Sequence, residues 1–338
     1  MHLNLIKKCF YLYRLIPTFQ GAFNLGKGSG YGKVILFGEH FVVHGVPGIV
    51  SAIDSTTDAE VKKTVKGLIV KDERKTAKGY GEEKRLQQIE SIERMLKAMG
   101  LDTKTPLDIW IGGTLPGFSG LGASAASSVA IARAISEELS LNLSNEKINA
   151  IAYEAEKAYA GNPSGIDNTA ATYGGLMWFK KNPADGQDIV EKIHIRKPIE
   201  IVIGSTGKVA NTKAMVEGVS DRKKKNPTKY DPLFKQAESL AVAGRKALES
   251  GDLKKVGDLM NENHRILQEL GVSSRELDQL VDIAHKQGAF GAKLTGGGGG
   301  GCMVALTPGK EVQGKVVGAF KGAGYEYLMT KIGVVTQY

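Results

Sequence analysis

A glycine-rich turn that leads into a helix of small residues could bind an anion. The turn runs from Pro116 to Ser124 and reads Pro-Gly-Phe-Ser-Gly-Leu-Gly-Ala-Ser. The first N–H groups of a helix have no partner within it and lie at the positive end of its dipole, so we expect phosphate there. The alternative is a tight turn that only caps the helix, and this stretch taken alone slightly favours that alternative.

Two oxygen-bearing side chains could hold a metal ion beside such a phosphate. Ser124 adds a hydroxyl at the end of the turn. A helix is predicted from Glu146 to Tyr159, and at about 100 degrees per residue Glu156 borders its apolar face while Glu154 points to solvent. An inward carboxylate requires a partner, of which a cation is the simplest. An ion pair with a lysine or arginine is the alternative for Glu156.

Asp167 and Lys33 complete the groups that phosphoryl transfer to an alcohol requires. Asp167 lies in the first turn of a short predicted helix, where the helix dipole keeps a carboxylate ionised and able to accept a proton. Its spacing from Ser164 also fits a capping box, which would be a structural role. Lys33 starts an apolar strand and supplies a cation for the developing charge. A phosphate cradle, a metal site, a proton acceptor and a cation together indicate a kinase.

The composition argues against several other functions. The 338 residues include 43 glycines and carry a net charge of +9, which suits an anionic ligand. No basic run is interleaved with aromatic residues, so we expect no nucleic-acid partner. Cys9 and Cys302 are the only cysteines, which excludes a disulfide framework and a zinc site. They favour a reducing compartment, and we expect a cytoplasmic protein in which Cys302 is a buried small residue.

The predicted elements divide the chain into three parts. Residues 1–30 contain basic but no acidic residues, so we expect a disordered extension or an organelle presequence, too interrupted to span a membrane. Residues 31–198 form a first domain, and residues 199–338 form a second one with long helices and a loop of six glycines at 296–301. The strands expected in the first domain include 33–37, 49–53, 59–70, 107–111 and 176–179.

Four segments resemble, in their order and spacing, the motifs of the GHMP kinases. They are Gly32–Gly45, Pro116–Ser124, Gly161–Asn168 and Lys293–Gly301. Within this family the mevalonate kinase branch is the most similar, because Glu39-His40 is followed by Val-Val and the third segment contains Asn-Pro-Ser-Gly-Ile-Asp. The rival interpretations are another kinase of the family, such as phosphomevalonate kinase, a non-catalytic sensor on the same fold, and an RNA-binding protein.

The resemblance implies a fold and a set of ligands. The N-terminal domain would be α/β, like the second domain of ribosomal protein S5, and the C-terminal domain would be a ferredoxin-like α+β domain. ATP would lie over the glycine-rich turn together with Mg²⁺. Mevalonate, which would receive the phosphoryl group on its 5-hydroxyl in isoprenoid biosynthesis, would lie between the domains. Homodimers are common in the family, so we expect one here.

The resemblance also implies roles for single residues. Asp167 would take the alcohol proton, Lys33 would stabilise the reacting oxygens, and Ser124 with Glu156 would hold the metal. The substrate-binding residues would be Lys33, Glu39, His40, Asp167 and Thr212. The nucleotide-binding residues would be Pro116, Gly117, Phe118, Ser119, Gly120, Leu121, Gly122, Ala123 and Ser124. The chain departs from the family pattern at Tyr31, Ala123, Ala160 and Gly297.

Overall fold

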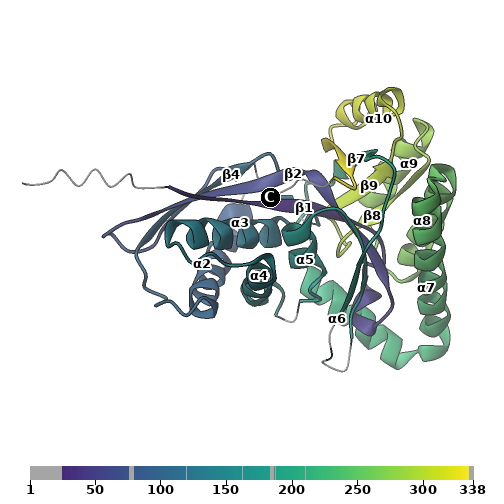
Figure 1. Ribbon diagram of the computed structural model, residues 1–338. Coiled ribbons are helices and arrows are strands. Elements are labelled where there is room, and N and C mark those ends of the chain that lie inside the picture. Colours follow the sequence, from purple (N-terminus) through teal and green to yellow (C-terminus); the bar gives the residue numbers. More distant parts are fainter. Residues whose placement is uncertain are drawn as a thin grey trace, which may run out of the picture.

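The computed structural model describes residues 25–75, 80–118, 120–161, 163–182, 186, 188–209 and 211–334. Within these residues the strands form a 10-stranded sheet. Figure 1 shows that this sheet has two parts, each with its own group of helices. The first part contains the strands of the N-terminal half of the chain, and the second contains those of the C-terminal half.

The first part of the sheet is built around the long strand β2 (Gly48–Lys63). β2 pairs antiparallel with three strands, β1 (Gly26–Phe37), β4 (Leu107–Gly113) and β5 (Leu176–Lys180). Two short strands lie outside these, β3 (Ile69–Asp72) beside β4 and β6 (Ile189–Lys192) beside β5. The sequence indicated two separate strands where β2 is continuous, because β1 bonds along nearly its whole length and holds it extended.

Four helices belong to this part, two of them packed on its strands and two packed mainly on the other helices (Figure 1). They are α2 (Tyr80–Ala98), α3 (Ala123–Glu138), α4 (Asn145–Ala160) and α5 (Ile166–Tyr173). α3 lies against β1 and β2, and its many alanines are buried. Ser144 caps α4, because its side chain accepts a hydrogen bond from the backbone N–H of Lys147.

Alternate glycines in β1 let α3 approach the strand at backbone distance. A Cβ atom on Gly26, Gly28 or Gly30 would lie 2.2 Å from a backbone carbonyl oxygen of α3. Such a contact is sterically impossible, so only glycine fits these positions. Residues 26–30 therefore belong to the sheet, which corrects the predicted extension of residues 1–30 at its end. Residues 1–24 of that extension lie outside the described residues.

The second part of the sheet has the strand order β10-β7-β9-β8, with every neighbouring pair antiparallel. These strands are β7 (Ile199–Ser205), β8 (Gly291–Thr295), β9 (Cys302–Leu306) and β10 (Glu326–Ile332). Helices follow β7 and separate β9 from β10, which gives the β-α-β-β-α-β order of a ferredoxin-like domain. The predicted ferredoxin-like fold is confirmed.

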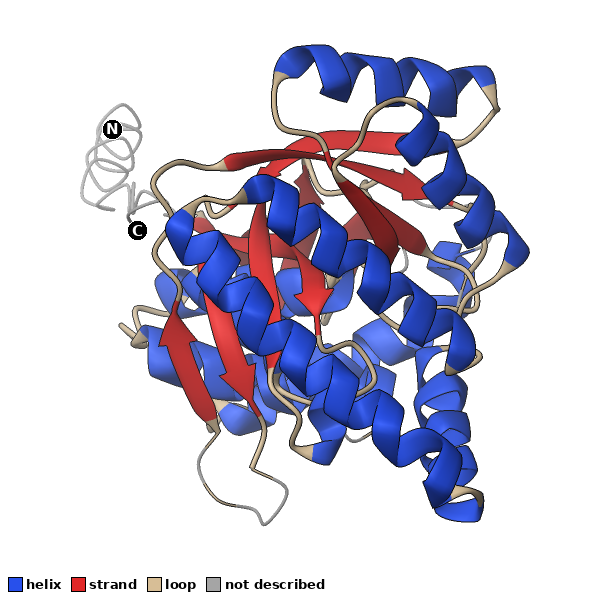
Figure 2. Cartoon of the chain, turned by 90° about the vertical axis from the view of Figure 1, so that its right-hand side faces the viewer, coloured by secondary structure: helices blue, strands red, loops and turns tan. Residues whose placement is uncertain are grey.

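Five helices belong to this second part, three of them packed on its strands, and Figure 2 shows the longer ones lying across the molecule on this side. They are α6 (Thr212–Lys225), α7 (Pro227–Ser250), α8 (Leu253–Glu269), α9 (Arg275–Lys286) and α10 (Lys310–Gly322) among the described residues. Asn211 caps α6 by accepting a hydrogen bond from the backbone N–H of Ala214.

The two parts of the sheet are joined directly. Ile332 of β10 pairs with Ile53 of β2, and the Thr295 hydroxyl of β8 accepts a hydrogen bond from the backbone N–H of Ile35 at 2.8 Å. The domain boundary after residue 198 stays a prediction, although β7 starts at the next residue. Within the described part of the chain, no helix combines the length and the apolar character that crossing a membrane requires.

Candidate active site

A cleft of about 1980 Å³ is lined by residues of both parts of the molecule. One wall comes from β1, the glycine-rich turn, α4 and α5, and the other from α6 and the loop after β8. The predicted residues that line it are Lys33, Glu39, His40, Phe118, Gly120, Gly122, Ala123, Ser124, Glu156, Asp167 and Thr212. Of the described turn residues, Pro116, Gly117 and Leu121 do not line it. Ser119 lies outside the described residues.

The ammonium group of Lys33 lies between Asp167 and the glycine-rich turn. Its Nζ is 3.0 Å from Asp167 Oδ1 and donates a hydrogen bond to the carbonyl of Gly120 at 3.3 Å. The Lys33 side chain is 3% exposed and that of Asp167 is 34% exposed, so only the carboxylate remains open to a ligand. The predicted capping box does not form, because Gly165 and not Ser164 is the N-cap of α5, and the Ser164 hydroxyl accepts instead from the backbone N–H of Ile166 at 3.4 Å.

The glycine-rich turn passes directly over the Lys33 side chain. Gly122 is the N-cap of α3 with a φ of 67°, and a Cβ atom there would lie 2.8 Å from Lys33 Cγ. The position therefore requires glycine for both its backbone conformation and its close contact. Among the described residues, no side chain caps the N-terminus of α3. Its first N–H groups are available to an anion at the positive end of the helix dipole.

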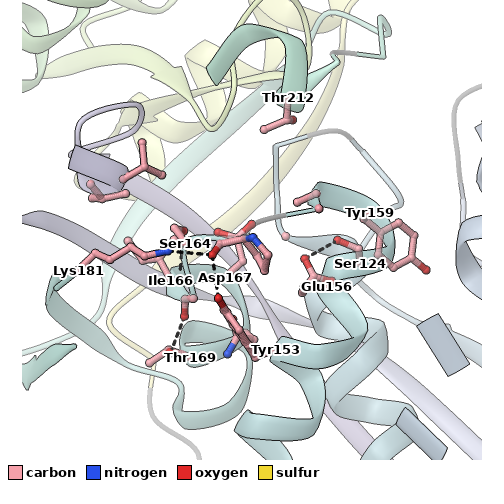
Figure 3. A pocket seen from close by; sticks show the side chains of 18 of the residues that line it. Ser124, Tyr153, Glu156, Tyr159, Ser164, Ile166, Asp167, Thr169, Lys181 and Thr212 are labelled. Carbon is pink, nitrogen blue, oxygen red and sulfur yellow. Dashed lines mark hydrogen bonds between the residues drawn. The ribbon is translucent and has the colours of Figure 1, made fainter. Parts of the chain in front are cut away.

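Ser124 and Glu156 meet at the wall next to this turn. The Ser124 hydroxyl donates to Glu156 Oε2 at 3.1 Å, as Figure 3 shows. The other carboxylate oxygen, Oε1, is buried and has no hydrogen-bond partner among the described residues. Burial, followed by repulsion from Asp167, raises the pKa of Glu156 to about 8 against the opposing effects of Ser124 and Lys33. The ion pair considered for Glu156 from the sequence is absent among the described residues, whereas the exposed Glu154 pairs with Lys157 at 2.6 Å.

These two side chains fit a divalent cation. Mg²⁺ takes oxygen ligands and usually binds through one or two carboxylates together with the phosphates of its nucleotide. The unpartnered oxygen of Glu156 and the hydroxyl of Ser124 supply such ligands at the N-terminus of α3. No group of three or more His, Cys, Asp or Glu side chains in the described residues could hold a metal by itself. The site is therefore suited to a metal that arrives with phosphate.

His40 and Thr212 lie on the side of the cleft formed by the loop after β8. His40 is 1% exposed, and its Nε2 is 2.9 Å from the carbonyl oxygen of Gly297. Burial lowers the pKa of His40 to about 4, so the imidazole is neutral, and its Nδ1 has no partner among the described residues. A Cβ atom on Gly297 would lie 2.9 Å from Thr212 Oγ1, and Figure 3 shows Thr212 across the pocket from Asp167.

Glu39 differs from the other predicted substrate residues. Its side chain is 0% exposed and forms an ion pair with Lys293 on β8. Asn263 on α8 donates to its second oxygen at 3.2 Å. The structure thus places Glu39 at the cleft wall with its carboxylate turned into the protein.

Arg74 supports the glycine-rich turn and was not found from the sequence. Its Nη1 donates to the carbonyl of Ala123 at 3.0 Å, and the neighbouring carbonyl of Lys75 accepts from the N–H of Gly117 at 2.8 Å. Asp72 holds the guanidinium through Nε at 2.9 Å. The segment after β3 therefore contacts both ends of the turn. No sequence pattern indicates this contact, because it depends on how β3 lies beside β4.

Comparisons with known proteins agree with this geometry. The family model described as GHMP kinases N terminal domain matches residues 88–175, and that described as GHMP kinases C terminal matches residues 245–326. Together they cover half of the chain. The chain belongs to the GHMP kinase family. Among its GHMP kinase relatives, the mevalonate kinase of Pyrococcus abyssi is 37% identical over 328 residues, which cover 90% of this chain and 94% of that protein.

Solved structures of other GHMP kinases share the fold. The crystal structure of L. major mevalonate kinase in complex with R-mevalonate has a TM-score of 0.85 and 39% identity, covering 91% of this chain and 95% of that one. Streptococcus pneumoniae phosphomevalonate kinase, in complex with phosphomevalonate and AMPPNP, has a TM-score of 0.71 and 17% identity, covering 90% and 99%. The second likeness concerns the fold alone. Mevalonate kinases use ATP as their co-substrate.

Proposed function

We propose that this GHMP kinase transfers the γ-phosphoryl group of ATP to the 5-hydroxyl of mevalonate. One observation carries the proposal: Lys33, paired with the partly exposed Asp167 at 3.0 Å, faces a glycine-rich turn at the start of α3. Phosphoryl transfer to an alcohol needs such a cation and proton acceptor beside a phosphate cradle. The choice of mevalonate is supported by relatives and a solved structure that bear the name mevalonate kinase at more than 35% identity.

The nucleotide would lie with its phosphates over the turn and the N-terminus of α3. Backbone N–H groups there would contact the phosphate oxygens, because glycine at 120 and 122 leaves the backbone accessible. Ser124 and Glu156 would hold Mg²⁺, which neutralises charge on the phosphates when it is bound. Phe118 and Ala123 also line the cleft at this end and would contact the nucleotide. His40 and Thr212 would contact mevalonate on the opposite side.

Asp167 and Lys33 would have different roles at the reacting hydroxyl, the first accepting its proton and the second stabilising its oxygen. A carboxylate is a weak base for an alcohol, so complete deprotonation before transfer is not expected. Lys33 stabilises the oxygen as it becomes negative, and the proton passes to Asp167 late in a loose transition state. The ion pair between the two side chains orients both groups for this exchange.

Phosphorylation of mevalonate by the purified chain, with ATP and Mg²⁺, tests the proposal. We expect Asp167→Asn and Lys33→Met to lower kcat by at least about 100-fold, since each removes a group that acts in the transition state. Lys286→Met, which removes an exposed lysine far from the cleft on α9, serves as the charge-matched control and should retain full activity.

A substrate panel separates this proposal from its rivals. Mevalonate, phosphomevalonate, homoserine and galactose are each offered with ATP, and ADP formation is measured. Preferential use of phosphomevalonate would replace the proposed substrate within the same family. An Asp167→Asn variant that kept most of its turnover would remove the proton-accepting role. A wild-type chain that phosphorylated none of the four would favour a sensor.

We also propose that the protein is a homodimer in the cytoplasm. The resemblance to the family supports the dimer. The sequence has only two cysteines, too few for a disulfide framework, which supports a reducing compartment such as the cytoplasm. Light scattering coupled to size-exclusion chromatography checks the first statement, where a mass near 36.2 kDa would show a monomer. Imaging of the tagged full-length chain in its own cell checks the second.

A further inference from the structure

A fully buried ion pair connects the two parts of the molecule close to the Lys33 side chain. Its members are Glu39, which follows β1, and Lys293 on β8, and both side chains are 0% exposed. The proposed phosphoryl transfer uses neither group directly. Two charges taken out of water gain little net stability unless their geometry is favourable and their remaining hydrogen bonds are made, so their presence calls for a physical reason.

The pair is completely hydrogen-bonded. Lys293 Nζ donates to Glu39 Oε1, to the carbonyl of Leu294 at 2.7 Å and to the carbonyl of Ile35 at 3.4 Å. These are the three bonds that an ammonium group can donate. Asn263 Nδ2 donates to the other oxygen of Glu39 at 3.2 Å. Each charge therefore has one fixed position.

The partners of this pair lie next to the residues that would react with or bind the substrates. Ile35 follows Lys33 on β1, and Thr295 holds it as well, through bonds of 2.8 Å to its N–H and 3.2 Å to its carbonyl. His40 follows Glu39 and contacts the carbonyl of Gly297 at 2.9 Å. β8 thus bonds to β1 at Ile35, two residues after Lys33, and to Glu39, which directly precedes His40.

We propose that Lys293 is a positioning residue, whose ion pair with Glu39 sets the places of Lys33 and His40 relative to the loop after β8. This inference rests on the proposed kinase function. The buried carboxylate of Glu39 is bonded to Lys293 and Asn263, so it does not contact the substrate itself. Its effect on the substrate is indirect, because it fixes the position of the neighbouring His40. A misplacement of about 1 Å at a reacting group can lower a rate about 100-fold, so such support has a measurable effect on catalysis.

Removing one charge and removing both charges separate positioning from stability. Lys293→Met leaves Glu39 buried and unpaired, so we expect this variant to lose much of its thermal stability. Lys293→Met combined with Glu39→Gln removes both charges, and we expect its melting temperature to return most of the way to that of the wild type. If the pair positions the site, the double variant should still have a KM for mevalonate raised about tenfold and a kcat lowered about tenfold. Its KM for ATP should stay within about twofold, because no hydrogen bond joins the pair to the glycine-rich turn among the described residues.

Asn263→Ala provides a milder variant on a different element. It removes one hydrogen bond to Glu39 from α8 without touching the cleft, and we expect a rise of about threefold in the KM for mevalonate. The control is Gln313→Ala, in which another buried side chain loses bonds to the carbonyls of Ile201 at 3.0 Å and Thr330 at 3.2 Å, remote from the cleft. It should lower stability and leave both KM values unchanged.

Hydrogen exchange measured by mass spectrometry gives a readout that does not depend on the substrate. We expect faster exchange of the segment 38–44 in the double variant and in Asn263→Ala, and no change there in Gln313→Ala. Wild-type kinetics in the double variant, or unchanged exchange in this segment, would overturn the positioning role. A wild-type chain that does not phosphorylate mevalonate would refute the proposed function alone, since the exchange experiment still tests the ion pair.

Discussion

At the scale of single residues, the proposed metal ligand Glu156 makes the stability of the protein depend on pH. Burial and the neighbouring Asp167 raise its pKa from 4.5 to about 8, so the carboxyl group is largely protonated at neutral pH when no cation is bound. The unfolded chain releases this proton above its ordinary pKa of 4.5. The folded state therefore binds the extra proton between these two values, and the free energy of unfolding falls as the pH rises through this range.

Glu156→Gln should remove this pH dependence. An amide cannot ionise, so without metal and nucleotide we expect the variant to have a melting temperature a few degrees above that of the wild type at pH 8.5. The difference should shrink toward pH 5, where the wild-type carboxyl is protonated. In the kinase assay the same variant should lose its response to Mg²⁺ and about 100-fold or more in kcat.

Glu154→Gln is the matched control for this prediction. Glu154 lies on the same helix with its side chain 42% exposed, and forms an ion pair with Lys157. Thermal melts followed by circular dichroism in EDTA at pH 5, 7 and 8.5 compare the three proteins. Equal melting curves for Glu156→Gln and the wild type at pH 8.5 would show that the carboxyl group is not held protonated.

The residues that could be found from the sequence are those whose signal is local. The helical period alone predicted that Glu156 faces inward, and the glycine-rich turn before a helix predicted a phosphate site. Arg74 and Lys293 could not be found in this way. Their contacts, to Ala123 and to Glu39, join segments far apart in the sequence and depend on how the strands pair. The inward orientation of the Glu39 carboxylate was missed for the same reason.

At the scale of elements, the N-terminal half of β1 is a strand that its sequence pattern did not predict. Residues 26–32 have glycine at every second position, where an amphipathic strand would have apolar side chains. The segment therefore resembles a flexible linker and not a strand. In the structure these glycines face neighbouring elements, and those at 26, 28 and 30 meet the backbone of α3. The long helices of the second part were expected from the sequence, because an apolar helical period is a local signal.

Gly28→Ala should therefore be much more harmful than an ordinary surface change. Its Cβ would lie 2.2 Å from the carbonyl oxygen of Ala130, and neither backbone can move without breaking the strand or the helix. We expect a loss of about 3 kcal/mol or more in the free energy of unfolding, measured by urea denaturation. Gly318→Ala is the control, because this glycine lies inside α10 with nothing within 4 Å of an added Cβ. It should stabilise the protein by about 0.5–1 kcal/mol. Equal effects of the two substitutions would contradict the close contact.

At the scale of the whole molecule, the sequence indicated two domains with a substrate between them. The ferredoxin-like order of the second part and the cleft lined by both parts agree with that arrangement. The sequence did not indicate how tightly the parts are joined. β10 continues the sheet onto β2, and Thr295 and Lys293 of β8 both bond to Ile35 of β1. Pairings between strands so distant in the chain leave no local pattern.

These junctions predict that the two parts unfold together. Several bonds from β8 reach Ile35 and Glu39 across the boundary between the two parts, so unfolding of the second part would remove these partners from both residues. Differential scanning calorimetry should therefore show a single transition, with equal calorimetric and van't Hoff enthalpies. Thr295→Val removes the hydroxyl that bonds Ile35 and should move the whole transition down by a few degrees. Two resolved transitions in the wild type, or a shift confined to one of two transitions in the variant, would show that the parts fold as separate units joined at residue 198.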